Sequence, residues 1–269
     1  MKINIFGSTG TIGLKTLNLI DKHFSNIKVN LLCANKNIKK IIYQIKKYKP
    51  KYVYLADDKS ANKLKLKIKS KTKVLSQNDL SKYLLQSKSD FTVLAISGFQ
   101  SLNFLEEIIF NTNNLGLVSK EAIVSAGHLF NKKKYFKKTN IFPLDSEHFA
   151  LFNYFENNYS LKKVKKIYLT ASGGPFLNRK YINLKNISFD QAIDHPKWKM
   201  GYKNSIDSAT LVNKCLEIIE AHYLFNIPFE KLDILIHPQA LIHSIFEHEN
   251  YVSNNTFNNC SIAINKICR

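Results

Sequence analysis

Two acidic residues, Asp145 and Glu147, follow a short segment that is predicted to form a strand. If the chain stays extended there, side chains two residues apart point to the same side. A pair of carboxylates at the end of a strand offers the hard oxygen ligands that Mg²⁺ and Mn²⁺ prefer. The same Asp-Ser-Glu run is also typical of a helix N-terminus, where the carboxylates cap the first turn and face the helix dipole. The spacing alone leaves both interpretations open.

A third carboxylate lies in the segment Ser208–Phe225, which is predicted to be one long amphipathic helix. Asn213 and Glu217 are four residues apart and share a face of that helix, with Lys214 beside them. An amide, an ammonium group and a carboxylate near one face could complete a site for a metal ion and a phosphate. The turn that begins at Ser172 (Ser-Gly-Gly) adds a hydroxyl group and accessible backbone N–H groups, which suit a phosphate.

A glycine-rich loop, residues 7–13 (GSTGTIG), connects a predicted strand at Lys2–Phe6 to a predicted helix at Ile12–His23. Glycines in such a loop permit a tight turn, close approach of the backbone to a pyrophosphate, and close packing of the helix on the strand. The helix N-terminus then offers free N–H groups and the positive end of its dipole to the phosphates. The strand–loop–helix context favours a dinucleotide-binding loop over an ordinary glycine-rich turn.

The end of the second predicted strand, Val29–Ala34, bears on the choice of cofactor. NAD-dependent enzymes usually have Asp or Glu there, and its carboxylate binds the 2′-hydroxyl group of the ribose. Here the strand is followed by Asn35, Lys36 and Asn37, with no carboxylate among them. The lysine favours the 2′-phosphate of NADP. In so lysine-rich a chain, an ordinary solvated Lys36 is the alternative.

The formal net charge is +20, from 40 Lys and Arg residues against 20 Asp and Glu residues. Only Arg179 and Arg269 are arginines, and the lysines are spread along the chain. Nucleic-acid readers depend on arginine forks and placed aromatic residues, so a nucleic-acid partner is the weaker alternative, whereas anionic phosphorylated substrates would be attracted. No run approaches the ~20 apolar residues that span a bilayer. Because the first strand begins at Lys2, with no room for a leader ahead of it, we expect a soluble, cytoplasmic protein with no membrane partner.

Short apolar strands alternate with helical segments over the first 145 residues, which predicts a Rossmann-type, doubly wound parallel sheet with right-handed crossovers. The strands are predicted at Lys2–Phe6, Val29–Ala34, Tyr52–Ala56, Lys73–Leu75, Phe91–Ile96, Leu115–Val118 and Asn140–Pro143. The helices are predicted at Ile12–His23, Ile38–Tyr48, Leu102–Phe110 and Glu121–Phe136, with a lysine-rich helix after the third strand.

The pattern changes after about residue 145. Beyond it the sequence predicts a strand, a polar loop-rich stretch, the long helix and two further strands, at Val164–Ala171, Asp194–Ser205, Ser208–Phe225, Leu232–Ile236 and Ile242–Glu247. We therefore predict an α/β protein of two domains: residues 1–145 as a dinucleotide-binding domain, and residues 146–269 as an α+β catalytic domain that binds metal and substrate.

Six motifs lie along the chain in a fixed order: GSTGTIG, PLDSEH, LTASGGPF, DHPKWKMG, DSATLVNKCLEIIEA and IHPQALIHS. Through these motifs the sequence resembles the 1-deoxy-D-xylulose 5-phosphate reductoisomerase family. The resemblance implies an oxidoreductase that depends on NADPH and on Mg²⁺ or Mn²⁺ and acts in the non-mevalonate isoprenoid pathway. Its product would be 2-C-methyl-D-erythritol 4-phosphate, and the protein would be a homodimer.

The resemblance also implies roles for individual residues. The metal ligands would be Asp145, Glu147 and Glu217. The cofactor would contact Thr9, Gly10, Thr11, Ile12, Asn35, Lys36, Asn37, Ser119, Glu121 and Gly201. The phosphorylated sugar substrate would contact Lys120, Ser146, Glu147, Ser172, His195, Trp198, Ser208, Asn213, Lys214 and Glu217. The catalytic residues among these would be Lys120, Glu147, His195 and Glu217, and a loop that closes over the substrate would carry His195, Trp198 and Met200.

Two features depart from the family pattern. Ser119 stands where the family usually has Asn before a Lys-Glu pair, so a shorter side chain adjoins one cofactor contact. The family also continues into a C-terminal helical domain, which we expect to be absent because the sequence stops at Arg269. The alternative function is therefore a catalytically impaired, NADP-binding remnant of the enzyme. Four further residues are interpreted as structural rather than as ligands: His148, Glu220, His237 and His243.

Overall fold

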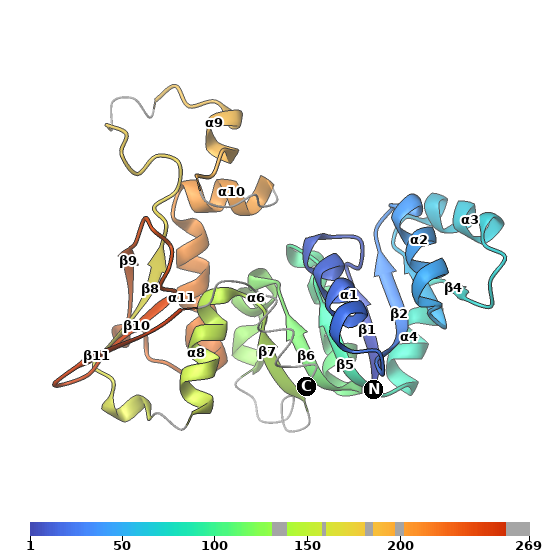
Figure 1. Cartoon of the computed structure of the whole chain (residues 1–269), viewed down its shortest axis with the longest axis horizontal. Helices are drawn as coiled ribbons and strands as arrows, with labels where there is room; N and C mark the ends of the chain where they lie inside the picture. Colours follow the sequence, from blue (N-terminus) through green and yellow to red (C-terminus); the bar gives the residue numbers. More distant parts are fainter. Residues whose placement is uncertain (131–138, 158–159, 181–184, 197–201, 257–269) are drawn as a thin grey trace. The chain divides into compact units, whose positions relative to one another are not determined.

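The computed structural model describes residues 1–130, 139–157, 160–180, 185–196 and 202–256. The chain divides into two compact units, Met1–Leu144 and a second unit that begins at Asp145 (Figure 1). The first unit holds a seven-stranded sheet and the second a four-stranded sheet, each with its own helices. The predicted α/β class, with a doubly wound parallel sheet followed by an α+β part, is confirmed.

All neighbouring strands of the first sheet are parallel, in the order β4-β3-β2-β1-β5-β6-β7. The strands are β1 (Lys2–Phe6), β2 (Lys28–Ala34), β3 (Tyr52–Leu55), β4 (Lys73–Leu75), β5 (Ser89–Leu94), β6 (Thr112–Leu117) and β7 (Asn140–Pro143). The strand order reverses between β1 and β5. Ligands of open parallel sheets bind outside the carboxyl ends of the strands at such a switch point, and the glycine loop follows β1 there.

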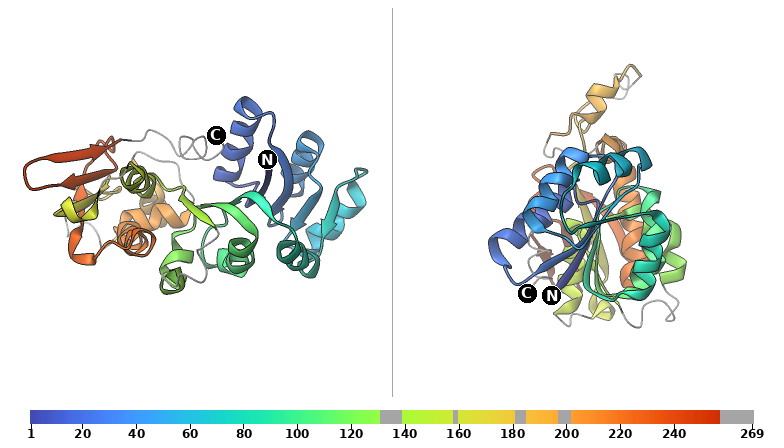
Figure 2. Two further views of the ribbon diagram at one scale, coloured as in Figure 1. Left: turned by 90° about the horizontal axis from the view of Figure 1, so that it is seen from below. Right: turned by 90° about the vertical axis from the view of Figure 1, so that its right-hand side faces the viewer.

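Helices cover both faces of this sheet (Figure 2). They are α1 (Thr11–His23), α2 (Ile38–Tyr48), α3 (Asp58–Lys67), α4 (Gln77–Gln86), α5 (Leu102–Asn111) and α6 (Lys120–Phe130), with a short 3₁₀ turn, η1 (Phe99–Ser101). Right-handed crossovers place α1 and α2 on one face and α5 and α6 on the other, because the chain progresses in opposite directions along the sheet. The sequence pattern missed α4, and residues 131–136 of the predicted helix Glu121–Phe136 lie outside the described residues.

The central strands are buried on both faces, which explains why they are continuous apolar runs in the sequence. Ile3, Ile5, Leu31 and Leu32 are completely buried in β1 and β2. Asn4 is the polar exception in β1. Its carboxamide accepts a hydrogen bond from the Tyr83 hydroxyl, so this buried polar group is satisfied.

The second sheet is mixed, with the order β11-β10-β8-β9. Only β8 and β9 pair in parallel within it. Its strands are β8 (Lys166–Ala171), β9 (Leu232–Ile236), β10 (Ser244–Glu247) and β11 (Val252–Asn255). The other elements of this unit are α8 (Ser146–Glu156), η2 (Leu161–Lys163), α9 (Phe189–Ile193), α10 (Tyr202–Ala209), α11 (Val212–Phe225) and η4 (Phe229–Lys231). The core joins α8 and α11 to the sheet through Leu151, Tyr154, Ile167, Leu169, Ala221, Leu232 and Phe246.

The prediction of one continuous helix over Ser208–Phe225 is wrong. The helix is broken into α10 and α11, and Leu211 between them has φ 62°, in the left-handed region. The Thr210 hydroxyl donates to backbone carbonyls of α10, a contact that is typical of bent or ending helices. Among the described residues, none of the helices has both the length and the hydropathy that crossing a bilayer requires.

Candidate functional site

The N-terminus of α8 presents two of the three predicted metal-binding carboxylates. Asp145 is the N-cap residue, and its Oδ1 accepts a hydrogen bond from the backbone N–H of Glu147 at 3.1 Å. The extended-chain interpretation of this segment is therefore wrong, and the helix-cap interpretation is confirmed. The side chain of Ser146 donates to Glu147 Oε2 at 2.7 Å. Capping thus places both carboxylates within the first turn, at the positive end of the helix dipole.

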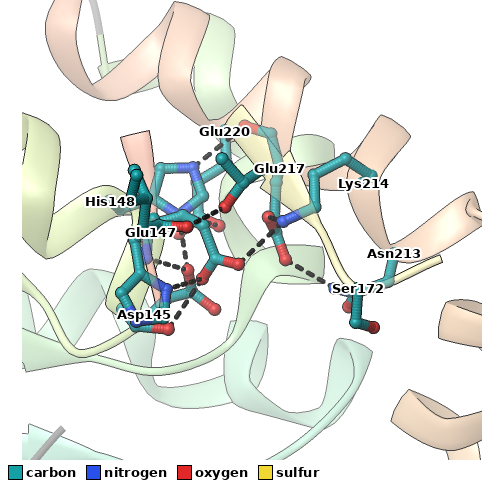
Figure 3. A network of polar contacts seen from close by, with 12 residues as sticks. Asp145, Glu147, His148, Ser172, Asn213, Lys214, Glu217 and Glu220 are labelled. Atoms are coloured by element: carbon teal, nitrogen blue, oxygen red, sulfur yellow. Dashed lines mark hydrogen bonds and ion pairs between the residues drawn. The ribbon is translucent and has the colours of Figure 1, made fainter. Parts of the chain in front are cut away.

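The third carboxylate comes from α11. Asp145, Glu147 and Glu217 each offer one carboxylate oxygen, and these oxygens all lie within 4.8 Å of one another (Figure 3). Glu217 is buried, whereas the other two are partly exposed. Three hard oxygen donors from two helices, with partial access from solvent, fit a divalent cation such as Mg²⁺ or Mn²⁺.

Lys214 lies among these carboxylates. Its ammonium group is 2.8 Å from Glu147 Oε1 and also bonds Glu217, while the Asn213 amide donates to the other oxygen of Glu217. Burial alone would raise the pKa of Glu147, but the Lys214 charge outweighs it, with help from His243, and lowers that pKa from 4.5 to about 2. Glu147 is therefore ionised at neutral pH, as a metal ligand must be.

His148 lies beside the carboxylates and connects α8 to α11 (Figure 3). Its Nε2 is 2.9 Å from the backbone carbonyl of Glu217, and its Nδ1 is 3.1 Å from Asp145 and 3.3 Å from Glu220. Burial lowers the pKa of this ring, but the Glu220 and Asp145 carboxylates raise it to about 9. Both ring nitrogens therefore donate, which confirms His148 as a hydrogen-bonding residue and pairs it with Glu220.

A second group of polar residues follows β8. The Ser172 hydroxyl lies 3.0 Å from His195 Nε2, and burial lowers the pKa of this histidine. Gly173 and Gly174 both have positive φ, and a Cβ atom at Gly174 would lie 2.8 Å from the backbone oxygen of Ser208. The Ser-Gly-Gly turn therefore contacts the end of α10 closely, and only glycine fits there.

The glycine loop of the first unit is tightly built. Gly7 has φ 79°, and a Cβ atom there would lie 2.2 Å from the Ala95 carbonyl oxygen. A Cβ atom at Gly13 would lie 2.3 Å from the Gly7 oxygen. Gly10 is the N-cap of α1, with no side chain to cap the helix, and the first turn contains no acidic residue. This helix N-terminus and its cradle of glycines fit an anionic pyrophosphate.

The other predicted cofactor residues of this unit occupy defined positions. Asn37 caps α2, since its carboxamide accepts from the Lys40 backbone N–H at 3.0 Å. The Ser119 hydroxyl contacts Glu121 Oε2 at 3.0 Å and the Gly98 carbonyl at 3.2 Å. The structure adds Ser101, whose hydroxyl donates to the Ser119 hydroxyl at 3.0 Å. No sequence motif had indicated Ser101.

Within the second unit, many of the predicted residues lie at or near the ends of α8, β8, α9, α10 and α11: Asp145, Ser146, Glu147, Ser172, His195, Ser208, Asn213, Lys214 and Glu217. Trp198, Met200 and Gly201 lie outside the described residues. His243, which was predicted to be structural, has its Nδ1 atom 3.9 Å from Glu147 Oε2. Because His243 and Glu147 are distant in sequence, only the position of His243 in the HPQALIHS motif could have indicated that it lies near the carboxylates.

The fold and the site define a class of protein: a Rossmann-type domain joined to an α+β unit that carries a cluster of carboxylates suited to a divalent cation. Two family models match the chain, that of 1-deoxy-D-xylulose 5-phosphate reductoisomerase over residues 3–127 and that of its C-terminal domain over residues 141–225. The chain belongs to the 1-deoxy-D-xylulose 5-phosphate reductoisomerase family.

Curated relatives carry the same name. The chain is 41% identical to the reductoisomerase of Persephonella marina over 246 residues, and 43% identical to that of Pelagibacter ubique over 257 residues. These alignments cover 91% and 94% of this chain, but 62% and 66% of the two relatives. The chain thus spans somewhat less than two thirds of the length of these curated relatives.

Solved structures of the family have the same fold. A reductoisomerase in complex with NADPH, fosmidomycin and magnesium superimposes with a TM-score of 0.89 at 28% identity. The enzyme from Zymomonas mobilis in complex with NADPH superimposes with a TM-score of 0.86 at 32% identity. Each comparison covers 99% of this chain and 69% of the other.

Proposed function

We propose that the chain catalyses the NADPH- and divalent-metal-dependent isomerisation and reduction of 1-deoxy-D-xylulose 5-phosphate to 2-C-methyl-D-erythritol 4-phosphate. The observation that carries the proposal is the convergence of Asp145, Glu147 and Glu217 in a member of this family. A solved relative bound to NADPH, fosmidomycin and magnesium supports the same classes of ligand. The phosphorylated sugar, rather than a nucleic acid, is the proposed partner of this basic chain.

Asp145, Glu147 and Glu217 would hold the divalent cation. When bound, Mg²⁺ or Mn²⁺ supplies a Lewis acid and a template for the carbonyl and hydroxyl oxygens of the substrate. Asn213 keeps Glu217 oriented through its amide. Lys214 contributes a positive charge next to the carboxylate oxygens of Glu147 and Glu217. His148 holds the two helices that carry the ligands in register through bonds to Asp145 and to the Glu217 backbone.

The phosphate group of the substrate would bind where the Ser172-Gly173-Gly174 turn meets Ser208 at the end of α10. The backbone N–H groups and hydroxyls there suit a phosphate. Because the phosphate is held at a distance from the reacting carbons, its binding positions those carbons for the reaction. His195, Ser146 and Lys120 are proposed as further substrate contacts. Trp198 and Met200 are proposed to belong to a loop that excludes water from the site.

The first unit is proposed to bind NADPH, which supplies the hydride when bound, and the second unit to be catalytic. Thr9, Gly10, Thr11 and Ile12 would contact the pyrophosphate. Asn35, Lys36 and Asn37 would contact the adenosine end, and Ser119, Glu121 and Gly201 the remainder of the cofactor. The supporting observations are that Gly10 and Thr11 at the N-terminus of α1 are exposed and that its first turn contains no acidic residue.

We also propose that the protein acts in the cytoplasm as a homodimer, as the family resemblance implies. Light scattering of the purified chain, as it stands, would give twice the chain mass of 31.0 kDa.

The test of the activity is NADPH oxidation by this chain in the presence of 1-deoxy-D-xylulose 5-phosphate and Mg²⁺ or Mn²⁺. Glu217→Gln should abolish turnover and weaken Mn²⁺ binding, because one ligand loses its charge. Glu230→Gln makes the same chemical change at an exposed turn and should leave both unchanged. Absence of turnover together with failure to bind fosmidomycin would contradict the proposal. Binding of NADP⁺ without turnover would instead support the alternative of an impaired remnant.

A further inference from the structure

Gln44 places a polar group on the buried face of α2, between Ile41 and Ile45. Only 1% of its surface is exposed, and an uncompensated amide is costly to bury. Both ends of the amide are paired with one residue of the glycine loop. Its Nε2 donates to the Ser8 backbone carbonyl at 2.8 Å, and its Oε1 accepts from the Ser8 hydroxyl at 2.9 Å.

Ser8 is thereby held at three points. Besides the two bonds to Gln44, its backbone N–H donates to the Cys33 carbonyl at 2.9 Å. Lys40, one turn earlier on the same face of α2, donates to the Thr9 carbonyl at 3.3 Å. Two successive carbonyl groups of the loop are therefore bonded by donors from α2.

The consequence for an anionic ligand follows from the planar trans peptide. Because the carbonyl of one residue and the N–H of the next point in opposite directions, a Ser8 carbonyl held by Gln44 directs the Thr9 N–H away from α2. The next N–H, of Gly10, closes the turn on the Gly7 oxygen at 3.0 Å. A peptide flipped at Ser8 would instead present a carbonyl oxygen where an N–H is needed.

We propose that Gln44 is a positioning residue that locks the glycine loop in the conformation that receives the cofactor pyrophosphate. This inference rests on the proposed NADPH binding. Gln44 acts through Ser8 and touches no reacting atom. Its contribution is preorganisation: the loop is ordered before the cofactor arrives, so binding does not bear the cost of ordering it.

The test compares the unaltered chain of 269 residues with Gln44→Met, which keeps the length of the side chain but removes its donor and its acceptor. NADP⁺ affinity, measured by calorimetry, should fall about tenfold, which is the scale of one lost buried hydrogen-bond pair. Affinity for adenosine 2′-phosphate, which lacks the pyrophosphate, should change less than about twofold. Amide hydrogen exchange of residues 8–12 should accelerate in the cofactor-free variant.

Ser8→Ala is the second variant, since it removes one of the two bonds and adds no volume. Its NADP⁺ affinity should fall about threefold, with adenosine 2′-phosphate unaffected. Gln86→Met, at an exposed position that ends α4, is the matched control and should bind both ligands as the wild type does. The inference would be overturned if Gln44→Met and Ser8→Ala both bound NADP⁺ as tightly as the wild type. It would also be overturned if they lost affinity equally for NADP⁺ and for adenosine 2′-phosphate. A wild-type chain that binds neither ligand would instead contradict the proposed function itself.

Discussion

Lys214 lies between two carboxylates that the chain gathers for a cation. Its Nζ contacts Glu147 and Glu217, and all three side chains are largely buried. Without this ammonium group or a metal ion, two like charges would share a site of low dielectric constant. Lys214 therefore stabilises the folded chain when no metal is bound.

Lys214→Met should lower the free energy of unfolding of the metal-free protein by about 3 kcal/mol, because it removes the positive charge that lies between two largely buried carboxylates. Saturating Mn²⁺ should restore more stability to this variant than it adds to the wild type. Urea denaturation with and without Mn²⁺ measures both effects. Lys203→Met, which removes a more exposed ion pair with Asp207, is the control and should cost less than about 1 kcal/mol. Equal costs for the two variants would refute this role of Lys214.

His195 supplies a pH-dependent contribution to stability. Burial lowers its pKa below 6.5, so the folded state favours the neutral ring. The unfolded chain takes up the proton near pH 6.5, so the contribution is present above that pH and is lost as the pH falls below it. A histidine titration followed by NMR should give a midpoint below 6.5. The difference in unfolding free energy between wild type and His195→Asn should shrink from about pH 7.5 to about pH 5.5. A midpoint at or above 6.5 would contradict the buried, neutral ring.

The break between α10 and α11 determines where α11 begins, and hence where Asn213 and Lys214 project. Leu211 holds a left-handed backbone conformation that costs a residue with a Cβ atom about 1–2 kcal/mol. Leu211→Gly should remove this cost and, after the larger entropy of the unfolded glycine chain, stabilise the protein by about 0.5 kcal/mol. Leu211→Ala keeps the Cβ atom and should give no gain. Chemical denaturation distinguishes them, and equal stabilities of the two variants would show that the backbone is not strained there.

The sequence predicted the strands of the first sheet well, because strands buried on both faces are continuous apolar runs, as in β1 and β2. It missed α4, although Ser76 and Asp79 form a capping box at the start of that helix. It also missed the break at Leu211, where neither Gly nor Pro marks the change and close contact with the Gly174 turn accompanies it. Such tertiary contacts override local periodicity.

The candidate site was predicted in composition but not in geometry. The spacing of Asp145 and Glu147 allowed either an extended pair or a helix cap, and the structure shows that a helix cap brings them together. The hydrogen bonds between Gln44 and Ser8 and the ion pair between His148 and Glu220 join residues far apart in sequence or on different helices. A single sequence contains no signal for such pairs, since a polar residue on a helix is usually solvated.

At the scale of the whole molecule, each unit has its own sheet and its own buried core. The seven strands of the first sheet all come from Met1–Leu144, and the carboxylate cluster comes entirely from the second unit. The proposed cofactor loop and the proposed metal ligands are therefore supported by separate cores. Ligands for the two sites should stabilise different parts of the chain.

We expect NADP⁺ to slow amide hydrogen exchange in peptides from β1, α1 and β2, and Mn²⁺ to slow it in peptides from α8 and α11. A ligand at about 100 times its dissociation constant stabilises the state that binds it by about 2.7 kcal/mol, which is enough to separate the two patterns. Glu217→Gln should abolish the protection by Mn²⁺ and leave that by NADP⁺ intact. Gln44→Met, with its roughly tenfold weaker NADP⁺ binding, should reduce the protection by NADP⁺ to about half and leave that by Mn²⁺ intact. Protection of the same peptides by both ligands would show that the two units unfold as one, because each ligand would then stabilise the whole chain.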